Sequence, residues 1–195
     1  MAVIILKPIT NTLTVPNQNI DELVALCREG NRSAQFEVYN RYYKAMYNTA
    51  LRIVKDVHWA EDVMQEAFLK AFTKISAYRG EVAFGAWLKR IVVNHSLDSY
   101  KKINRDIAEP LEDILYKVED DGYKEEAKVD FQSMQVQQVG AAIQSLKESY
   151  RLVLTLLYIE GYDQEEICEI MAITPGNCRT TISRAKESLL KKLRG

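Results

Sequence analysis

A basic, hydroxyl-rich segment near the C-terminal end of the chain has the side chains with the clearest chemistry. Between Thr174 and Gly195 there are six Lys or Arg residues and one Glu. Helical spacing predicts a buried side made of Cys178, Ile182, Ala185 and Leu189. The outward side is then expected to present Arg179, Thr180, Thr181, Ser183, Arg184 and Lys186. Arginine can bind guanine through two hydrogen bonds, and lysine and hydroxyl groups hold phosphates, so this side suits a DNA major groove.

The preceding segment is expected to form the first helix of a helix-turn-helix. Asp163 is placed to cap that helix, with two carboxylates in the opening turn. A short corner at Ala172 and Ile173 follows, and Thr174 can cap the second helix. Taken alone, this stretch leaves open an ordinary C-terminal helix whose basic residues complement the helix dipole and face water.

Composition indicates a folded, helical protein without metal or disulfide chemistry. Of the 195 residues, 47% are apolar and 27% charged, and eight Gly and four Pro leave few sheet turns, so we expect an all-α fold. Cys27, Cys168 and Cys178 are odd in number, lack metal-ligand spacing and are interpreted as reduced packing residues. The N-terminus has no basic segment followed by a cleavage site, and no apolar run reaches membrane length, so a cytoplasmic location is expected.

The net charge of −1 conceals a strong segregation of charge along the chain. Residues 31–105 hold 13 basic and 7 acidic residues, whereas residues 106–148 hold 4 basic and 11 acidic ones. Because phosphate attraction depends on local fields, two basic regions flanking an acidic middle are compatible with nucleic-acid binding. We expect a tail (1–18), a first domain (19–105), an acidic linker (106–131) and a second domain (132–195).

The first domain reads as amphipathic helices, and one of them carries an unusual exposed side. Helices are expected over 19–28, 33–55, 59–75 and 83–103, and over 136–146 and 149–158 in the second domain. In the 59–75 helix, the predicted buried side consists of Val63, Ala67, Phe68, Ala71 and Phe72. The opposite side groups Asp62, Gln65, Glu66 and Leu69. A polar ridge that includes a leucine suits a protein contact, although a solvated acidic face is the alternative.

A glycine-containing loop then leads into an aromatic and basic helix. Unstacked bases need flat surfaces and cations for their phosphates, so this segment suits single-stranded nucleic acid. Phe84 and Trp87 are expected in the core. The side chains expected to be exposed and to contact nucleic acid, together with Arg79 of the loop, are Tyr78, Lys89, Arg90, Asn94, Lys101 and Lys102.

These segments resemble the bacterial sigma factors of the sigma-70 family, specifically the extracytoplasmic-function (ECF) group. The similarity lies in Ala60–Phe68, in Tyr78–Asn94 and in the run from Asp163 to Lys186, in the family's order and spacing. It implies two small helical domains, sigma region 2 and the helix-turn-helix of region 4, joined by the acidic linker. No cofactor, metal or catalytic group is implied.

The resemblance also implies roles for matching residues. Asp62, Gln65, Glu66 and Leu69 match the surface that docks on core RNA polymerase. The loop 78–82 with Arg90 and Asn94 matches the part that captures a flipped base of the −10 element. The basic face of the last helix matches the part that reads the −35 element as duplex. The expected partners are core polymerase, promoter DNA in duplex and single-stranded form, and an anti-sigma factor.

Two other classes of protein remain open at this stage. A one-component regulator binding duplex DNA as a dimer explains the last helix but gives no role to the ridge around Glu66. The other alternative is a helical adaptor that binds only proteins. An enzyme is not expected, because His58 and His95 lack partners at metal or triad spacing. We further hypothesise that the free chain is autoinhibited, with the acidic middle segment folding over the basic faces.

Overall fold

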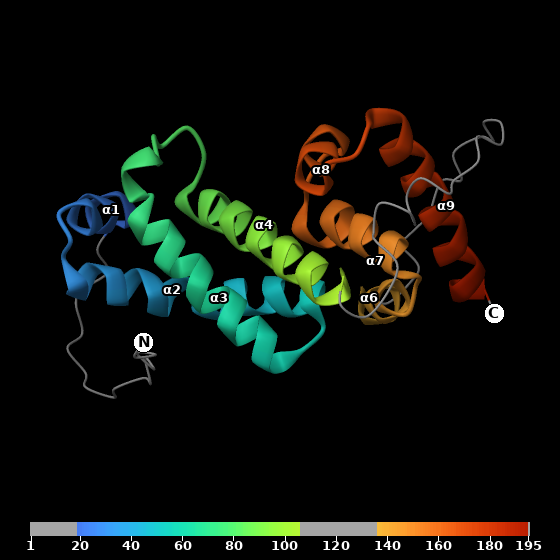
Figure 1. Cartoon of the computed structure of the whole chain (residues 1–195), viewed down its shortest axis with the longest axis horizontal. Helices are drawn as coiled ribbons and strands as arrows, with labels where there is room; N and C mark the ends of the chain where they lie inside the picture. Colours follow the sequence, from blue (N-terminus) through green and yellow to red (C-terminus); the bar gives the residue numbers. More distant parts are fainter. Residues whose placement is uncertain (1–18, 106–135, 195) are drawn as a thin grey trace.

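The computed structural model describes residues 19–105 and 136–194, and every regular element within these two ranges is helical. The expected all-α fold with two helical units is confirmed for this part of the chain (Figure 1). The predicted tail 1–18 and the predicted acidic linker 106–131 lie outside the described residues.

The first unit is built from α1 (Ile20–Arg28), α2 (Arg32–Val54), α3 (Val57–Thr73), the short 3-10 helix η1 (Ile75–Ala77) and α4 (Phe84–Arg105). Asparagine or aspartate side chains cap three of these helices: Asn19 accepts from the N–H of Asp21, Asn31 from Ala34 and Asp56 from Trp59. Each cap satisfies an N–H group that has no partner inside its helix.

The second unit contains α6 (Val136–Gln144), α7 (Glu148–Leu154), the π-helical segment η2 (Thr155–Glu160), α8 (Gln164–Met171) and α9 (Pro175–Arg194). Helix boundaries predicted from the sequence agree within two or three residues, except that the helix expected over 149–158 changes to π-helix after Leu154. Over six residues, hydrophobic spacing does not distinguish these two helix types.

Apolar side chains at helical spacing form the core of the first unit. α2, α3 and α4 pack against one another and bury Val38, Ile53, Phe68 and Leu88. Gly85 allows the start of α4 to approach α2 closely, because a Cβ atom at this position would lie 3.0 Å from the Tyr42 ring. The basic helix α4 is therefore fixed along the surface of the bundle.

The helix-turn-helix has the local chemistry that the sequence predicts. Asp163 and Glu166 form a capping box at the start of α8, and Thr174 Oγ1 accepts from the N–H of Asn177 at the start of α9. Between the two helices, Ala172 adopts a left-handed conformation with φ 57°. Glycine usually occupies such a position, because a Cβ atom is strained there.

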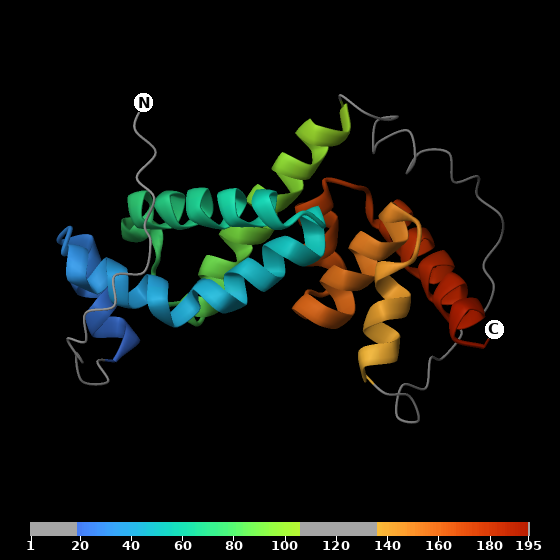
Figure 2. The ribbon, with the colours of Figure 1, turned by 90° about the horizontal axis from the view of Figure 1, so that it is seen from below.

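The two units are in contact, with the second unit lying against α2 and α4 (Figures 1 and 2). Arg151 of α7 donates to the backbone carbonyls of Arg52 (2.6 Å) and Ile53 (3.1 Å) at the end of α2. Lys55 Nζ donates to the carbonyl of Gln144 over 3.0 Å. No sequence pattern predicted this contact.

Replacing Ala172 with Gly is expected to raise the free energy of unfolding by about 0.5–1 kcal/mol, because glycine removes the Cβ strain of the left-handed conformation. Urea denaturation followed by circular dichroism measures the change. The matched control is Gly161→Ala, which introduces a Cβ at φ 79° with no other atom within 4 Å and should lower stability by a similar amount. A neutral or destabilising Ala172→Gly contradicts the strain argument.

Candidate nucleic-acid and protein interfaces

One side of α3 presents the polar ridge that the sequence predicts. Asp62 and Glu66 are exposed, Gln65 is half-buried, and the Leu69 side chain is 64% exposed. On the opposite side Val63, Ala67, Phe68 and Ala71 are buried as expected, and Phe72 is half-buried. The contact of the Leu69 side chain with water is unfavourable. A protein partner that covers this side chain would remove that contact.

His95 of α4 links this ridge to the basic helix, a connection that the sequence analysis missed. Its Nε2 lies 2.7 Å from Glu66 Oε2 and its Nδ1 lies 2.6 Å from Lys70 Nζ. An ammonium group can only donate, so Nδ1 accepts and the proton on Nε2 donates to Glu66. Glu66 and Lys70 stand one turn apart on α3, but their spacing carries no information about a histidine 25 residues further on.

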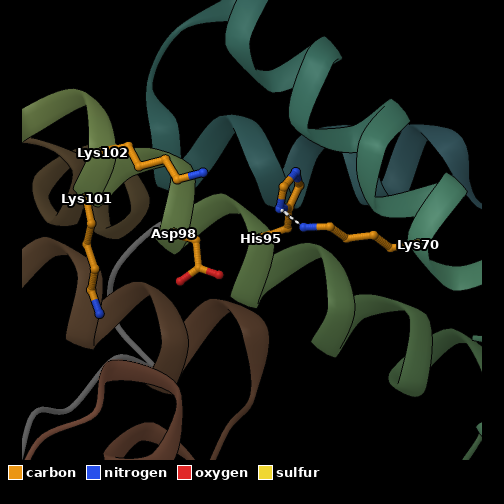
Figure 3. Close-up of a pocket in the computed structure, with 5 residues that line it drawn as sticks. All are labelled: Lys70, His95, Asp98, Lys101 and Lys102. Atoms are coloured by element: carbon orange, nitrogen blue, oxygen red, sulfur yellow. Dashed lines mark hydrogen bonds between the residues drawn. The ribbon is translucent and has the colours of Figure 1, made fainter.

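Beside His95, α3 and α4 form a shallow pocket rich in ammonium groups. It is lined by Lys70, His95, Asp98, Lys101 and Lys102 (Figure 3). The structure thus places the two predicted nucleic-acid contacts Lys101 and Lys102 in the lining of the same pocket as Lys70. Three cations with one carboxylate favour an anionic group such as a phosphate. Among the described residues, no group of three or more His, Cys, Asp or Glu side chains could hold a metal ion.

The prediction that Tyr78 is exposed is wrong. Its side chain is only 7% exposed, and its ring packs against Phe84 and Trp87 with centroid distances of 5.4 Å in both cases. Its hydroxyl donates to the carbonyl of Val82 over 2.8 Å and so closes the loop between η1 and α4. Burying the aromatic ring is favourable, and burying the hydroxyl costs little here because the hydroxyl keeps a hydrogen bond.

Three other residues of this loop and of α4 are exposed as predicted. Arg79 and Asn94 are exposed, and Lys102 is exposed while Lys101 is half-buried. Val82 at the end of the loop is 54% exposed, and Gly80 has φ 78°. Phe84 is buried and Trp87 half-buried, which agrees with their expected place in the core. The loop therefore exposes one basic side chain, Arg79, and one apolar side chain, Val82, and the hydrogen bond of Tyr78 holds its conformation.

Lys89 and Arg90 were predicted to be exposed, but both are half-buried beneath the second unit. Lys89 Nζ donates to the Glu160 carbonyl, and Arg90 donates to Glu169 over 3.0 Å. Both cations also lie over the ring of Tyr162, at 5.3 and 5.5 Å from its centroid. Burial raises the pKa of the Tyr162 hydroxyl to about 12, although Arg90 acts in the opposite direction.

On α9, the predicted outward face is exposed in part, and the predicted exposure of Thr181 is wrong. Arg179 and Ser183 are exposed, and Thr180, Arg184 and Lys186 are half-buried. Thr181 is 1% exposed, and its hydroxyl has no hydrogen-bond partner. The position lies three residues after Cys178, so it belongs to the buried stripe together with Ile182. The predicted burial of Cys178, Ile182, Ala185 and Leu189 is confirmed.

Two family models match the chain in the order of its two helical units. Residues 38–106 match sigma-70 region 2, and residues 136–189 match sigma-70 region 4. The chain is 31% identical over 184 residues to the ECF RNA polymerase sigma factor SigW of Bacillus subtilis, covering 90% of this chain and 97% of that protein. The chain belongs to the ECF group of the sigma-70 family. It is a sigma factor, which directs RNA polymerase to initiate transcription at promoters.

Further relatives agree with this assignment. The sigma-E factor of Escherichia coli is 30% identical over 186 residues, covering 88% of this chain and 92% of that protein. Two solved structures share the fold: CnrH in complex with the cytosolic domain of CnrY (TM-score 0.53, 21% identity, 90% and 98% coverage) and RpoE of Bartonella quintana in complex with the anti-sigma factor NepR (TM-score 0.53, 20% identity, 81% and 95% coverage). Neither the dimeric regulator nor the helical adaptor is favoured, because the regulator leaves the region 2 match unexplained and the adaptor gives no role to either matched region.

The burial of Thr181 leads to a test within this sigma factor. Thr181→Val is expected to leave promoter DNA binding unchanged and stability unchanged or up to about 1 kcal/mol higher, because valine removes an unpaired buried hydroxyl at nearly constant volume. Ser183→Val, the matched change on the exposed side, should weaken binding of duplex promoter DNA. Fluorescence anisotropy and thermal melting measure the two quantities. Lost DNA binding in Thr181→Val with its fold intact contradicts the buried placement.

Burial also decides which cysteine reacts. The pKa of the Cys178 thiol is raised to about 12, mainly by burial, and burial raises the pKa of Cys27 as well. Since the thiolate is the reactive form, both thiols should resist iodoacetamide at pH 8.5 in the native protein, while half-buried Cys168 is alkylated first. Peptide mass spectrometry before and after unfolding in urea checks this order. Rapid native alkylation of Cys178 contradicts it.

Proposed function

We propose that the two helical units of this sigma factor recognise different elements of the promoter. The first unit, residues 19–105, would bind core RNA polymerase and the melted −10 element, and the second, residues 132–195, would bind the −35 element as duplex. The two family-model matches and the segregation of exposed basic side chains into both units support this division. The acidic segment 106–131 joins them.

The ridge on α3 is the proposed docking surface for core polymerase. Asp62, Gln65 and Glu66 lie within two turns before Leu69 on the same side of α3, so the exposed leucine adds an apolar side chain to a polar surface. Such an arrangement is typical of protein interfaces, in which a few apolar side chains provide most of the binding free energy. His95 holds the Glu66 carboxylate from the side of α4, and Lys70 of α3 contacts the other ring nitrogen of His95.

For the −10 element, we propose that the loop 78–82 and α4 bind the opened strand. Arg79, Asn94 and the lysines of the pocket contact the nucleic acid, together with Lys89 and Arg90 once these are uncovered. Tyr78 is not proposed as a contact, since its ring is buried and its hydroxyl holds the loop. Flipping a base out of the stack costs a few kcal/mol, so capture of one flipped base can decide where opening occurs.

On the second unit, α9 is the proposed recognition helix. Arg179, Thr180, Ser183, Arg184 and Lys186 form the contact set, and Thr181 is left out because it faces the core. Arg179 and Arg184 suit bidentate contacts with guanine, and the hydroxyl groups and Lys186 suit phosphates. Pro175 and the Thr174 cap fix the start of α9, the end from which recognition helices commonly contact bases.

The proposed mechanism uses binding free energy and requires no catalytic group of this chain, so we propose that it is not an enzyme and that polymerase supplies the chemistry. We also propose an anti-sigma factor as a regulatory partner, because the solved relatives CnrH and RpoE were captured with CnrY and with an anti-sigma factor. A cytoplasmic location follows from these partners. No helix in the described ranges is long and apolar enough to cross a membrane.

Leu69→Ala is expected to weaken binding to core RNA polymerase by about tenfold, the loss typical of a central apolar interface residue. The matched control is Val57→Ala, which also removes an exposed aliphatic side chain from α3, outside the ridge. Titration of labelled protein with purified bacterial core enzyme measures affinity, and run-off transcription from genomic fragments measures initiation. Equal behaviour of the two variants contradicts the assigned ridge. Absence of specific initiation by the wild-type protein contradicts the proposed mechanism as a whole.

A further inference from the structure

A chain of three polar side chains connects the basic pocket with the exposed ridge of α3. Lys70 and Glu66 both belong to α3, and the imidazole ring of His95 on α4 contacts each of them. Glu66 and Lys70 are four residues apart, the spacing at which these residue types commonly pair on a helix surface. Here each contacts its own nitrogen of the His95 ring, at 2.6 Å for Lys70 and 2.7 Å for Glu66. The ring therefore links the two charged groups.

The His95 ring is the fixed member of this chain. Its side chain is only 9% exposed, and Val92 and Ser96 on the same helix are fully buried. The Glu66 side chain, by contrast, is 64% exposed. An exposed glutamate has several accessible rotamers, and a hydrogen bond from a fixed donor restricts them. The ring is thus placed to orient the carboxylate.

Lys70 determines which nitrogen of the His95 ring carries the proton. Its ammonium group can only donate, so it requires the lone pair of Nδ1, and the proton of the neutral ring then lies on Nε2, opposite Glu66 Oε2. The partner of one ring nitrogen sets the tautomer of a histidine and the direction in which the other nitrogen donates. In the other tautomer, Nε2 would direct a lone pair at the carboxylate. The hydrogen bond to Glu66 therefore depends on Lys70.

We infer that Lys70 and His95 are positioning residues for polymerase docking: Lys70 fixes the tautomer of His95, and the ring N–H holds the Glu66 carboxylate in one orientation. The inference rests on the proposed docking function of the ridge. It gives Lys70 a role in binding polymerase, although its ammonium group lies in the pocket proposed for DNA. Ordering a flexible side chain on binding costs affinity, so a carboxylate that is already oriented should bind about three- to tenfold more tightly.

The orientation of Glu66 can be tested without polymerase on the full-length protein. The chain has two histidines, and the other one, His58, is exposed. In proton NMR at pH 8 the Nε2–H signal of His95 should be observed far downfield, because its hydrogen bond to a carboxylate deshields the proton and slows its exchange with water. The ring N–H of His58 should exchange too rapidly to be seen. Glu66→Ala and Lys70→Met should each move the His95 signal upfield or abolish it.

Two substitutions of His95 separate the donor to Glu66 from the rest of the side chain. In His95→Gln the amide nitrogen lies near the position of Nε2 and can donate to Glu66, whereas in His95→Asn the shorter amide ends near the position of Nδ1. Titration of labelled protein with core polymerase, without DNA, measures the affinity. It should fall about three- to tenfold in His95→Asn and stay within about twofold of wild type in His95→Gln. In a Glu66→Ala background, His95→Asn should cause no further loss, because the two residues act as one unit.

Lys70→Met tests the other end of the chain without changing a buried residue. It should lower the affinity for core polymerase about threefold in the absence of DNA, because the tautomer of His95 is then no longer fixed. The matched control is Lys74→Met, which makes the same charge change one turn later, at the exposed C-cap of α3. It should leave the affinity unchanged, and equal losses in the two lysine variants overturn the role of Lys70. Circular dichroism and urea denaturation confirm that each variant is folded.

The outcomes separate this inference from the proposed docking surface. An unchanged His95 N–H signal in Glu66→Ala overturns the contact itself, whatever the polymerase titrations give. If Glu66→Ala weakens polymerase binding but His95→Asn and Lys70→Met do not, the docking surface stands and the positioning role is overturned. Equal losses from His95→Asn with and without Glu66 assign His95 a purely structural role and also overturn the inference. If neither Glu66→Ala nor Leu69→Ala weakens binding, the proposed docking surface is wrong, and the inference fails with it.

Discussion

The arrangement of the two helical units depends on the need to compensate two buried charges of opposite sign. Glu160 and Arg151 belong to the second unit, and the groups that compensate them belong mainly to α2. Removing an ion from water costs several kcal/mol unless well-placed partners replace the water. When the units separate, both charges regain water but lose these partners.

The contact between the two units covers only one of the two proposed surfaces of the first unit. The ridge around Leu69 on α3 stays exposed, whereas Lys89 and Arg90 on α4 are covered. His95 connects the two surfaces, because its two ring nitrogens contact Glu66 of the ridge and Lys70 of the basic pocket. The site thus consists of neighbouring faces of one small bundle.

Sequence patterns predicted the helices and the ridge because these depend on local periodicity and capping. Asp163 caps α8, and Leu69 points away from the core, as expected from spacing alone. The same reasoning failed for Thr181 and Tyr78, whose polar groups suggested exposure. A threonine in register with an apolar stripe is buried with it, and a tyrosine can be buried when its hydroxyl reaches a nearby carbonyl. Side-chain polarity is a weaker guide than position on the helix.

The sequence by itself determined the helical class, the helix-turn-helix chemistry, the exposed ridge and the resemblance that placed the chain in its family. These features arise from residues within a few turns of one another, where helix geometry fixes which side chains share a face. Only the tertiary structure decided that Arg90 lies against Glu169 and that Glu160 is paired with Arg52. These contacts join residues 79 and 108 positions apart, and no periodicity connects groups that meet only when two separate units pack together.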